Sequence, residues 1–191
     1  MQDPFEVLEL PLAYCVDSEQ LSMVFNDLSK KYHPDVSGGD RTKFEAVNAA
    51  HRTLSVTSSR LKALRALVFP DSEPARGGSM DPELMDLFSR MGPAVQKADE
   101  VAKQHSEAKS ALAKALVADA VWEARDQLEQ IGMEIAERLA GVESALAEMG
   151  EPGSGGTDEL GQLDRCYHTA AFLEKWQAQV REKLTVLMGA M

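Results

Sequence analysis

The stretch KKYHPDVSGGD, residues 30–40, decides how the N-terminal part of the chain is organised. Proline fixes its own φ and disfavours α geometry in the residue before it, so a preceding helix must end by His33. The Ser and Gly residues that follow are typical of a loop. The stretch is therefore predicted to be a turn between two helices, with the triplet His33-Pro34-Asp35 at its tip. That turn is either a plain connection or the part of the molecule that contacts another one.

Helical patterns lie on both sides of this turn. Upstream, Asp17 begins a capping-box pattern that ends at Gln20, and apolar residues at helical spacing predict a helix over residues 17–32. Downstream, Asp40 is suited to cap a helix over residues 41–56. Together they predict an antiparallel hairpin. Shorter helices are predicted from Asp3-Pro4 and over Ser59 to Phe69.

The remainder of the chain is rich in helix-forming residues and is broken at few places. Gly92-Pro93 is expected to kink or interrupt a helix that begins at Asp81-Pro82. A turn is expected within residues 104–120, because one helix through that region would be unusually long. Residues 150–159 are predicted to be a loop, and a last helix is predicted from about 160 to 187.

These elements indicate an all-α fold class with two parts. Residues 1–70 contain the helical hairpin, and residues 71–79 have the composition of a linker. Residues 80–191 are predicted to form an antiparallel three-helix bundle.

The charge of the two parts differs. The net charge is -11; residues 1–69 carry nine acidic and eight basic residues, whereas the rest carries 22 acidic and 12 basic ones. A nucleic-acid partner is not expected, because such binding needs clustered Lys and Arg. No apolar run approaches the length of a membrane span, and the first ten residues are acidic where a signal peptide would be basic. A soluble, cytoplasmic protein without a membrane partner is therefore expected.

Neither a metal site nor a cofactor is expected. Cys15 and Cys166 form no CxxC unit, which argues against a disulfide framework and against a zinc site. The other histidines, at positions 51, 105 and 168, have no ligand spacing. Cys15 is interpreted as a buried structural thiol.

The residues around the triplet resemble a J-domain, the module of DnaJ-type co-chaperones. The matching positions are Leu10-Pro11, Lys31-Tyr32-His33-Pro34-Asp35, Phe44, Val47-Asn48, Ala50 and Leu54. No Gly/Phe-rich segment and no zinc-binding cysteine pairs follow. The acidic helical second part, with AAFLEKWQAQVREKL at residues 170–184, is similar instead to the HscB-type co-chaperones of iron–sulfur cluster assembly.

This resemblance implies a chaperone partner. His33, Pro34 and Asp35 would contact a DnaK-class, HscA-like chaperone and promote ATP hydrolysis by that partner. Lys30 and Lys31 lie beside them and would steer toward an acidic surface. The family usually has more basic residues along this helix, where Ser22 and Asn26 stand here.

The resemblance also implies a client, an IscU-like iron–sulfur scaffold protein held by the bundle. The implied contact residues are Leu84, Met85 and Phe88, with Phe172 facing them. Just after this patch, where the family tends to carry acids, the chain has a serine and a glycine, at positions 89 and 92.

Core packing is the alternative explanation for these apolar residues. Leu84, Met85 and Phe88 cannot all point inward together with Leu87 and Met91, so some of these side chains are expected to be exposed. Phe172 and Trp176 lie four residues apart on one helical face, and core packing is the favoured interpretation for that pair.

Two other functions remain open at this point. A J-domain protein with a different client, or with a bundle used for dimerisation, would have the same pattern. A small helical enzyme with His33 and Asp35 as an acid–base pair would need a third group and a pocket, and no nucleophile motif accompanies the pair. The chain is therefore predicted not to be an enzyme.

Overall fold

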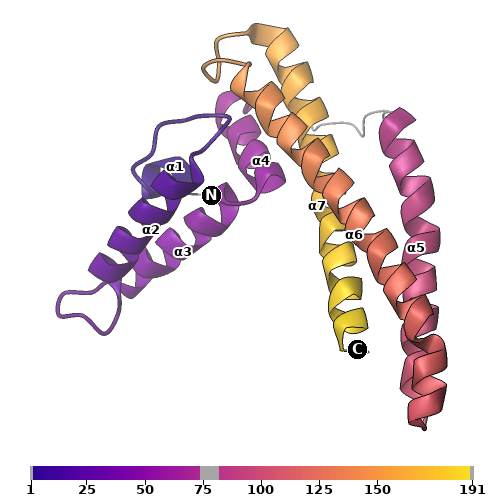
Figure 1. The fold of residues 1–191 in the computed structure, drawn as a ribbon. Coiled ribbons are helices and arrows are strands. Elements are labelled where there is room, and N and C mark those ends of the chain that lie inside the picture. Colours follow the sequence, from indigo (N-terminus) through magenta and orange to yellow (C-terminus); the bar gives the residue numbers. More distant parts are fainter. Residues whose placement is uncertain (1, 74–81, 190–191) are drawn as a thin grey trace. The chain divides into compact units, whose positions relative to one another are not determined.

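The computed structural model describes residues 2–73 and 82–189, and these residues form seven helices and no strand (Figure 1). The predicted all-α fold class is confirmed. The helices belong to two compact units. Unit 1 consists of Met1–Gly78 and Val142–Ala171, and unit 2 of Ser79–Gly141 and Phe172–Met191. Within the described residues, no helix has both the length and the apolar character that crossing a membrane requires.

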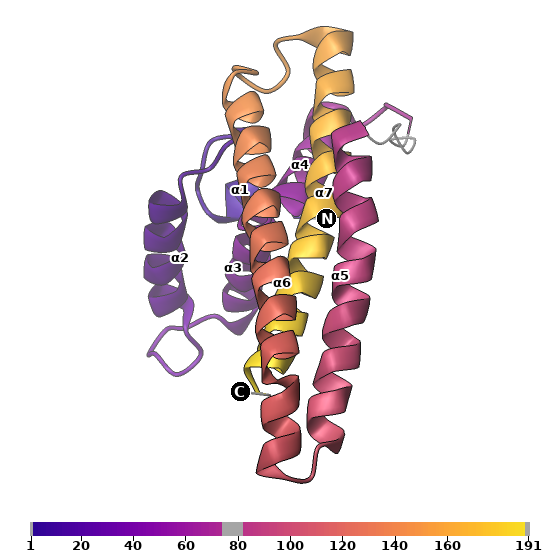
Figure 2. The same ribbon diagram turned by 45° about the vertical axis from the view of Figure 1, so that its right-hand side comes forward.

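The predicted hairpin is present in unit 1. It consists of α2 (Ser18–Tyr32) and α3 (Arg41–Leu54), which lie side by side (Figures 1 and 2). Both predicted caps are confirmed. The Asp17 carboxylate accepts a hydrogen bond from the N–H of Glu19 at 2.9 Å, and the Asp40 carboxylate accepts from the N–H of Thr42 at 3.0 Å. These caps begin the two helices at the predicted positions.

Two short helices complete the N-terminal part of unit 1. Helix α1 (Pro4–Val7) begins as predicted, with Asp3 as its N-cap and proline in its first turn. Helix α4 (Thr57–Val68) begins two residues before the predicted Ser59. Helix α3 packs against both of them as well as against α2, and this packing buries one side of the hairpin.

A buried arginine joins α4 to the end of α6 within unit 1. Arg60 is only 4 % exposed. Its guanidinium donates to the carbonyls of Tyr14 at 2.9 Å and Leu54 at 3.1 Å. It also donates to both carboxylate oxygens of Glu143, at 2.6 and 2.8 Å, and the Thr57 hydroxyl donates to the same carboxylate at 2.5 Å. Each nitrogen of the buried guanidinium therefore donates at least one hydrogen bond, and this bonding makes the burial of the charge tolerable.

A second carboxylate, Glu159, is buried at the start of α7. It accepts a hydrogen bond from the Tyr14 hydroxyl and from the N–H groups of Gly153, at 2.6 Å, and Gly155, at 2.5 Å. Desolvation and the adjacent carboxylate raise the pKa of Tyr14 well above its ordinary value. Nearby, Arg65 pairs with Asp164 at 2.7 Å.

Residues 142–171 therefore pack in the same unit as the N-terminal hairpin, although they lie in the stretch predicted to form the bundle. The division into 1–70, 71–79 and 80–191 stays a prediction about functional domains. Most of the predicted linker, residues 74–79, lies outside the described residues, as does Asp81 of the predicted helix start.

Three long helices form the bundle of unit 2. They are α5 (Pro82–Glu107), α6 (Ala111–Ala147) and α7 (Gly156–Met188), and the last two continue into unit 1 (Figure 2). The turn predicted within 104–120 is confirmed, at residues 108–110. Helix α7 begins at Gly156, four residues before the predicted start. Asp158 and Glu159 lie in its first turn, where negative charge favours the helix dipole.

A kink or an interruption was expected at Gly92-Pro93. The interruption is wrong, because α5 continues through Pro93. Both residues are exposed, whereas Met91 and Ala94 on either side of them are buried. Packing of the neighbouring residues therefore holds the helix together where its intrinsic propensity is poor. A glycine costs about 1 kcal/mol and a proline about 3 kcal/mol relative to alanine inside a helix.

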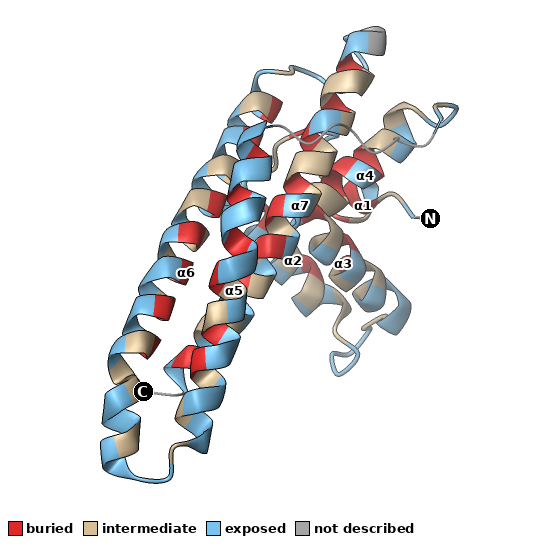
Figure 3. Cartoon of the chain, turned by 90° about the vertical axis from the view of Figure 1, so that its right-hand side faces the viewer, coloured by how far each residue is buried: buried red, intermediate tan, exposed pale blue. Residues whose placement is uncertain are grey.

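The core of unit 2 lies along the facing sides of its helices, as the burial colouring of α5 and α6 shows (Figure 3). Its fully buried members include Leu87, Leu128, Ile135, Leu173 and Leu187. Ion pairs border this core.

The α5–α6 contact in unit 2 also carries a paired carboxylate. Arg90 donates to both oxygens of Glu134, at 2.7 and 2.8 Å, and hydrogen bonding to this guanidinium lowers the pKa of Glu134. Arg138 contacts Glu83 at 3.2 Å. These pairs link α5 to α6 at the border of the core.

Candidate functional site

The His33-Pro34-Asp35 turn forms the end of the α2–α3 hairpin. His33 is the C-cap of α2 and has ψ near 131°, as the proline after it requires. The loop is closed by backbone hydrogen bonds. Val36 N–H donates to the His33 carbonyl at 3.0 Å, Gly39 N–H donates to the Val36 carbonyl at 2.8 Å, and Asp40 N–H donates to the Tyr32 carbonyl at 3.2 Å. The triplet is thus held on a short, internally bonded loop.

Gly39 is the position where this loop tolerates no side chain. A Cβ built on Gly39 would lie 2.0 Å from the carbonyl oxygen of His33 and 3.0 Å from that of Val36. The backbone at Gly39 passes directly against the backbone of His33. Glycine is required here for close approach of two backbone segments.

His33 and Asp35 are oriented differently with respect to solvent. The His33 ring lies edge-on against Phe44, with 5.2 Å between ring centroids, and its Nδ1 accepts from the N–H of Asp35 at 3.3 Å. The side chain of Asp35 is 88 % exposed, and its carboxylate is 3.7 Å from the His33 ring nitrogen. The aspartate is therefore free to accept hydrogen bonds from a partner, while the imidazole is held by the hairpin.

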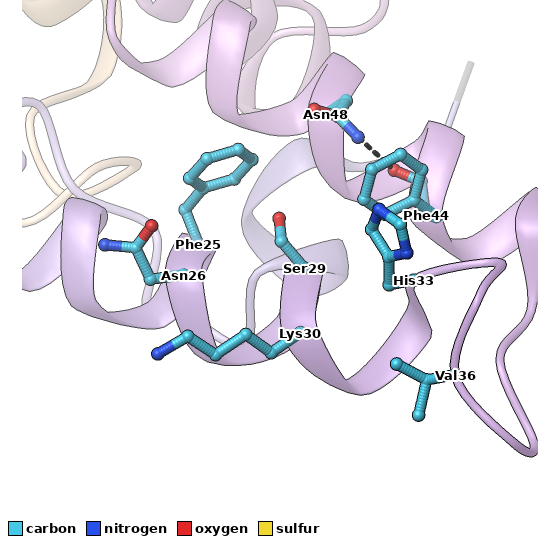
Figure 4. A pocket seen from close by; sticks show the side chains of 8 residues that line it. All are labelled: Phe25, Asn26, Ser29, Lys30, His33, Val36, Phe44 and Asn48. Atoms are coloured by element: carbon cyan, nitrogen blue, oxygen red, sulfur yellow. Dashed lines mark hydrogen bonds between the residues drawn. The ribbon is translucent and has the colours of Figure 1, made fainter.

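A pocket of about 460 Å³ lies between α2 and α3 beside the triplet (Figure 4). Its lining consists of Phe25, Asn26, Ser29, Lys30, His33, Val36, Phe44 and Asn48. Figure 4 shows the rings of His33 and Phe44 side by side, and the dashed line marks the bond from Asn48 to the Phe44 carbonyl, at 2.8 Å.

Sequence reasoning missed this pocket. Phe44 was named only as a position of the J-domain resemblance and Phe25 had no predicted role, and both side chains are half-buried. The sequence does contain one signal for it, which is a phenylalanine in each helix of the hairpin, Phe25 in α2 and Phe44 in α3.

Basic side chains surround the triplet. Lys30 and Lys31 are exposed at the end of α2, where positive charge is favourable to the helix dipole. Lys31 and Lys43 both lie near the ring of Tyr32, at 5.1 and 5.3 Å from its centroid. The predicted residues Lys30, Lys31, His33, Pro34 and Asp35 are therefore brought together at one end of the hairpin.

The apolar residues predicted to bind a client are only partly together. Leu84 is 6 % exposed and belongs to the core of unit 2, so its side chain is not available at the surface. Met85 and Phe88 are 51 % and 53 % exposed on the outer face of α5, and Phe172 is 39 % exposed on α7. Core packing is thus confirmed for Leu87 and Met91, and exposure of some of the patch is confirmed too.

Trp176 connects the two exposed phenylalanines. It is buried in the core of unit 2, stacks on Phe88 with 5.6 Å between centroids, and lies 6.2 Å from the ring of Phe172. The favoured core interpretation is therefore confirmed for Trp176 and wrong for Phe172, whose neighbour Leu173 takes the core position. We call Met85, Phe88 and Phe172, with Trp176 beneath them, the Phe88 surface.

The thiols are not suited to chemistry. Cys15 is half-buried and donates to the carbonyl of Glu143 at 3.3 Å, and Cys166 is buried. Burial raises the pKa of both thiols, so both are held protonated. Among residues 2–73 and 82–189, no group of three or more His, Cys, Asp or Glu side chains is arranged to hold a metal ion.

Comparison with known proteins finds a likeness among solved structures. Neither a scan against protein-family models nor a search of curated proteins found a match. Among solved structures, the chaperone HscB from Vibrio cholerae superposes with a TM-score of 0.54 and 20 % sequence identity, over 95 % of this chain and 96 % of that one.

The fold is similar to that of HscB. The likeness covers both units, so the similarity inferred from the triplet and the C-terminal helix is confirmed for the fold. At 20 % identity it concerns the arrangement of helices.

Proposed function

We propose that this protein is a co-chaperone: its hairpin stimulates ATP hydrolysis by a DnaK-class, HscA-like chaperone, and its bundle delivers an IscU-like iron–sulfur scaffold protein to that chaperone. The observation that carries the proposal is the exposed His33-Pro34-Asp35 turn, held at the end of the hairpin in a fold similar to HscB. The protein itself catalyses nothing in this scheme, because hydrolysis takes place in the partner.

The chaperone contact is built from one carboxylate and its surroundings. The exposed carboxylate of Asp35 can accept from an arginine of the chaperone, and a charge-assisted bond of this kind is about twice as strong as a neutral one. Lys30 and Lys31 raise the rate of encounter with an acidic surface. The apolar pocket beside His33 offers contact area to the same partner.

Client delivery is assigned to the Phe88 surface. Large exposed apolar side chains gathered on one face of a protein mark an interaction site. Aromatic residues with a rigid support are the usual anchors of such sites, and Trp176 provides that support for Phe88.

Single-turnover ATP hydrolysis tests the chaperone contact. With the purified HscA-like chaperone preloaded with ATP, the wild-type protein is expected to accelerate hydrolysis more than about tenfold, which corresponds to about 1.4 kcal/mol of barrier. His33→Gln is expected to give no acceleration, so that hydrolysis stays at the basal rate of the chaperone. The substitution removes the ring that packs on Phe44 and accepts a hydrogen bond from the N–H of Asp35.

His105→Gln is the matched control, since this histidine lies in the last turn of α5 rather than on the hairpin. It is expected to stimulate like the wild type. Absence of acceleration by the wild-type protein, or equal acceleration by His33→Gln, refutes the co-chaperone function.

Binding of the purified IscU-like scaffold, measured by calorimetry, tests the client surface. Met85→Ala/Phe88→Ala is expected to raise the dissociation constant more than about tenfold, because a truncated aromatic anchor costs on the order of 2 kcal/mol. Met133→Ala, at an exposed methionine of α6, serves as control and is expected to bind normally.

Unchanged binding by the double variant would place the client contact elsewhere. If the wild-type protein binds no scaffold while it stimulates the chaperone, the client is a different protein. Self-association of the wild type that the double variant abolishes would assign the surface to dimerisation.

A further inference from the structure

Gly92 and Pro93 are unusual residues for the interior of a helix, yet α5 continues through both of them. Both residues are exposed in the interior of a 26-residue helix. They are the two residue types least favourable at such a position. A Cβ built on Gly92 would meet no atom within 4 Å. Packing inside this chain therefore gives no reason for glycine at this position.

Gly92 lies on the face of α5 that carries the Phe88 surface. Gly92 is four residues after Phe88 and seven after Met85, and residues at these spacings share one side of a helix. All three are exposed. The missing side chain therefore leaves open space on α5 directly next to the exposed ring of Phe88.

Pro93 adds a hydrogen-bond acceptor to this space. It has no N–H to donate to the carbonyl of Ser89, which is the acceptor that residue 93 of a regular helix would use. A backbone carbonyl is a strong acceptor that gains from a donor. The exposed side of α5 therefore has an aromatic anchor with a gap beside it, and the carbonyl that lacks its helical donor belongs to the residue next to Phe88.

We propose that Gly92 is a specificity-determining residue of the Phe88 surface, because its lack of a side chain lets the backbone of a client segment approach α5 closely. The segment is extended, so that it has free N–H groups; one of them donates to the Ser89 carbonyl while an apolar side chain rests on Phe88. This inference rests on the client binding proposed above.

Scaffold binding by glycine variants tests the inference. Gly92→Leu fills the gap, and it is expected to raise the dissociation constant for the purified IscU-like scaffold at least about tenfold. Gly141→Leu is the matched control, because Gly141 is likewise exposed inside a helix and its Cβ would meet nothing within 4 Å. It is expected to bind within about twofold of the wild type, since interface energy is concentrated in few residues.

Thermal unfolding separates binding from folding. Leucine is a better helix former than glycine, so both variants are expected to melt at or above the wild-type temperature. Gly92→Ala adds a single methyl group and is expected to weaken binding less than leucine does. Equal binding by Gly92→Leu and Gly141→Leu overturns the inference.

Pro93→Ala tests the acceptor. It restores an N–H for the Ser89 carbonyl, so it is expected to raise the melting temperature and to weaken scaffold binding. A higher melting temperature with unchanged affinity overturns the role of the carbonyl. If the wild-type protein binds no scaffold, the proposed client is wrong and the role of Gly92 falls with it; normal scaffold binding together with an inert Gly92→Leu overturns the Gly92 role alone.

Discussion

Arg60→Met is expected to lower the free energy of unfolding of unit 1 by about 3 kcal/mol, which is the lower end of the range for breaking a buried ion pair by removing one partner. The substitution keeps an unbranched side chain but removes the N–H donors of Arg60 from the carbonyls of Tyr14 and Leu54. The Glu143 carboxylate loses its charged partner and keeps only the bond from the Thr57 hydroxyl. The lower end applies because the side chain of Glu143 is 39 % exposed and water can reach it. Urea unfolding followed by circular dichroism measures the loss.

Arg41→Met is the control for this experiment. Arg41 also pairs with a glutamate, Glu45, at 2.9 Å, but both side chains are mostly exposed. Exposed pairs contribute little, so the urea midpoint is expected to stay at the wild-type value. A midpoint for Arg60→Met that also equals the wild-type value would show that the buried pair contributes no net stability.

Gly39→Ala is expected to reduce stimulation of the chaperone to the level of His33→Gln while the helices remain folded. The added methyl group would lie 2.0 Å from the His33 carbonyl oxygen, far inside contact distance, so the loop must move away from the histidine. Because the clash is with backbone, no side-chain rotation relieves it. A displaced triplet would no longer be positioned for the proposed contact with the chaperone. A misplacement of about 1 Å can lower a rate by two orders of magnitude.

Gly38→Asn is the matched substitution for Gly39→Ala. Gly38 has φ of 86° and an added Cβ would meet nothing within 4 Å, and asparagine tolerates this left-handed region better than most residues. It is expected to stimulate hydrolysis nearly as the wild type does. Wild-type stimulation by Gly39→Ala would show that the loop does not set the position of the triplet.

The parts of the fold that could be predicted from sequence are those with a local cause. Asp17 and Asp40 cap their helices through bonds that span two or three residues, and Pro34 ends α2 by its own geometry. The position of the triplet followed from these signals. The turn between α5 and α6 was predicted from length alone, so its place at residues 108–110 had to come from the structure.

The parts that could not be predicted depend on contacts between distant residues. Arg60 and Glu143 are 83 positions apart, and nothing in the sequence near either of them indicates the other. Phe172 and Leu173 are adjacent and both apolar, so helical spacing alone did not decide which one enters the core. Leu84 and Met85 pose the same problem, and packing places the leucine inside.

The stacking of Phe88 on Trp176 offers an intrinsic fluorescence signal for anything that binds to the Phe88 surface. Trp122, the other tryptophan of the chain, is half-exposed on α6 and can be replaced by phenylalanine to leave a single fluorophore. The remaining indole, that of Trp176, is buried, yet it stacks on the exposed ring of Phe88. Its emission would then follow, without any attached dye, each arrival and departure of a molecule that covers Phe88.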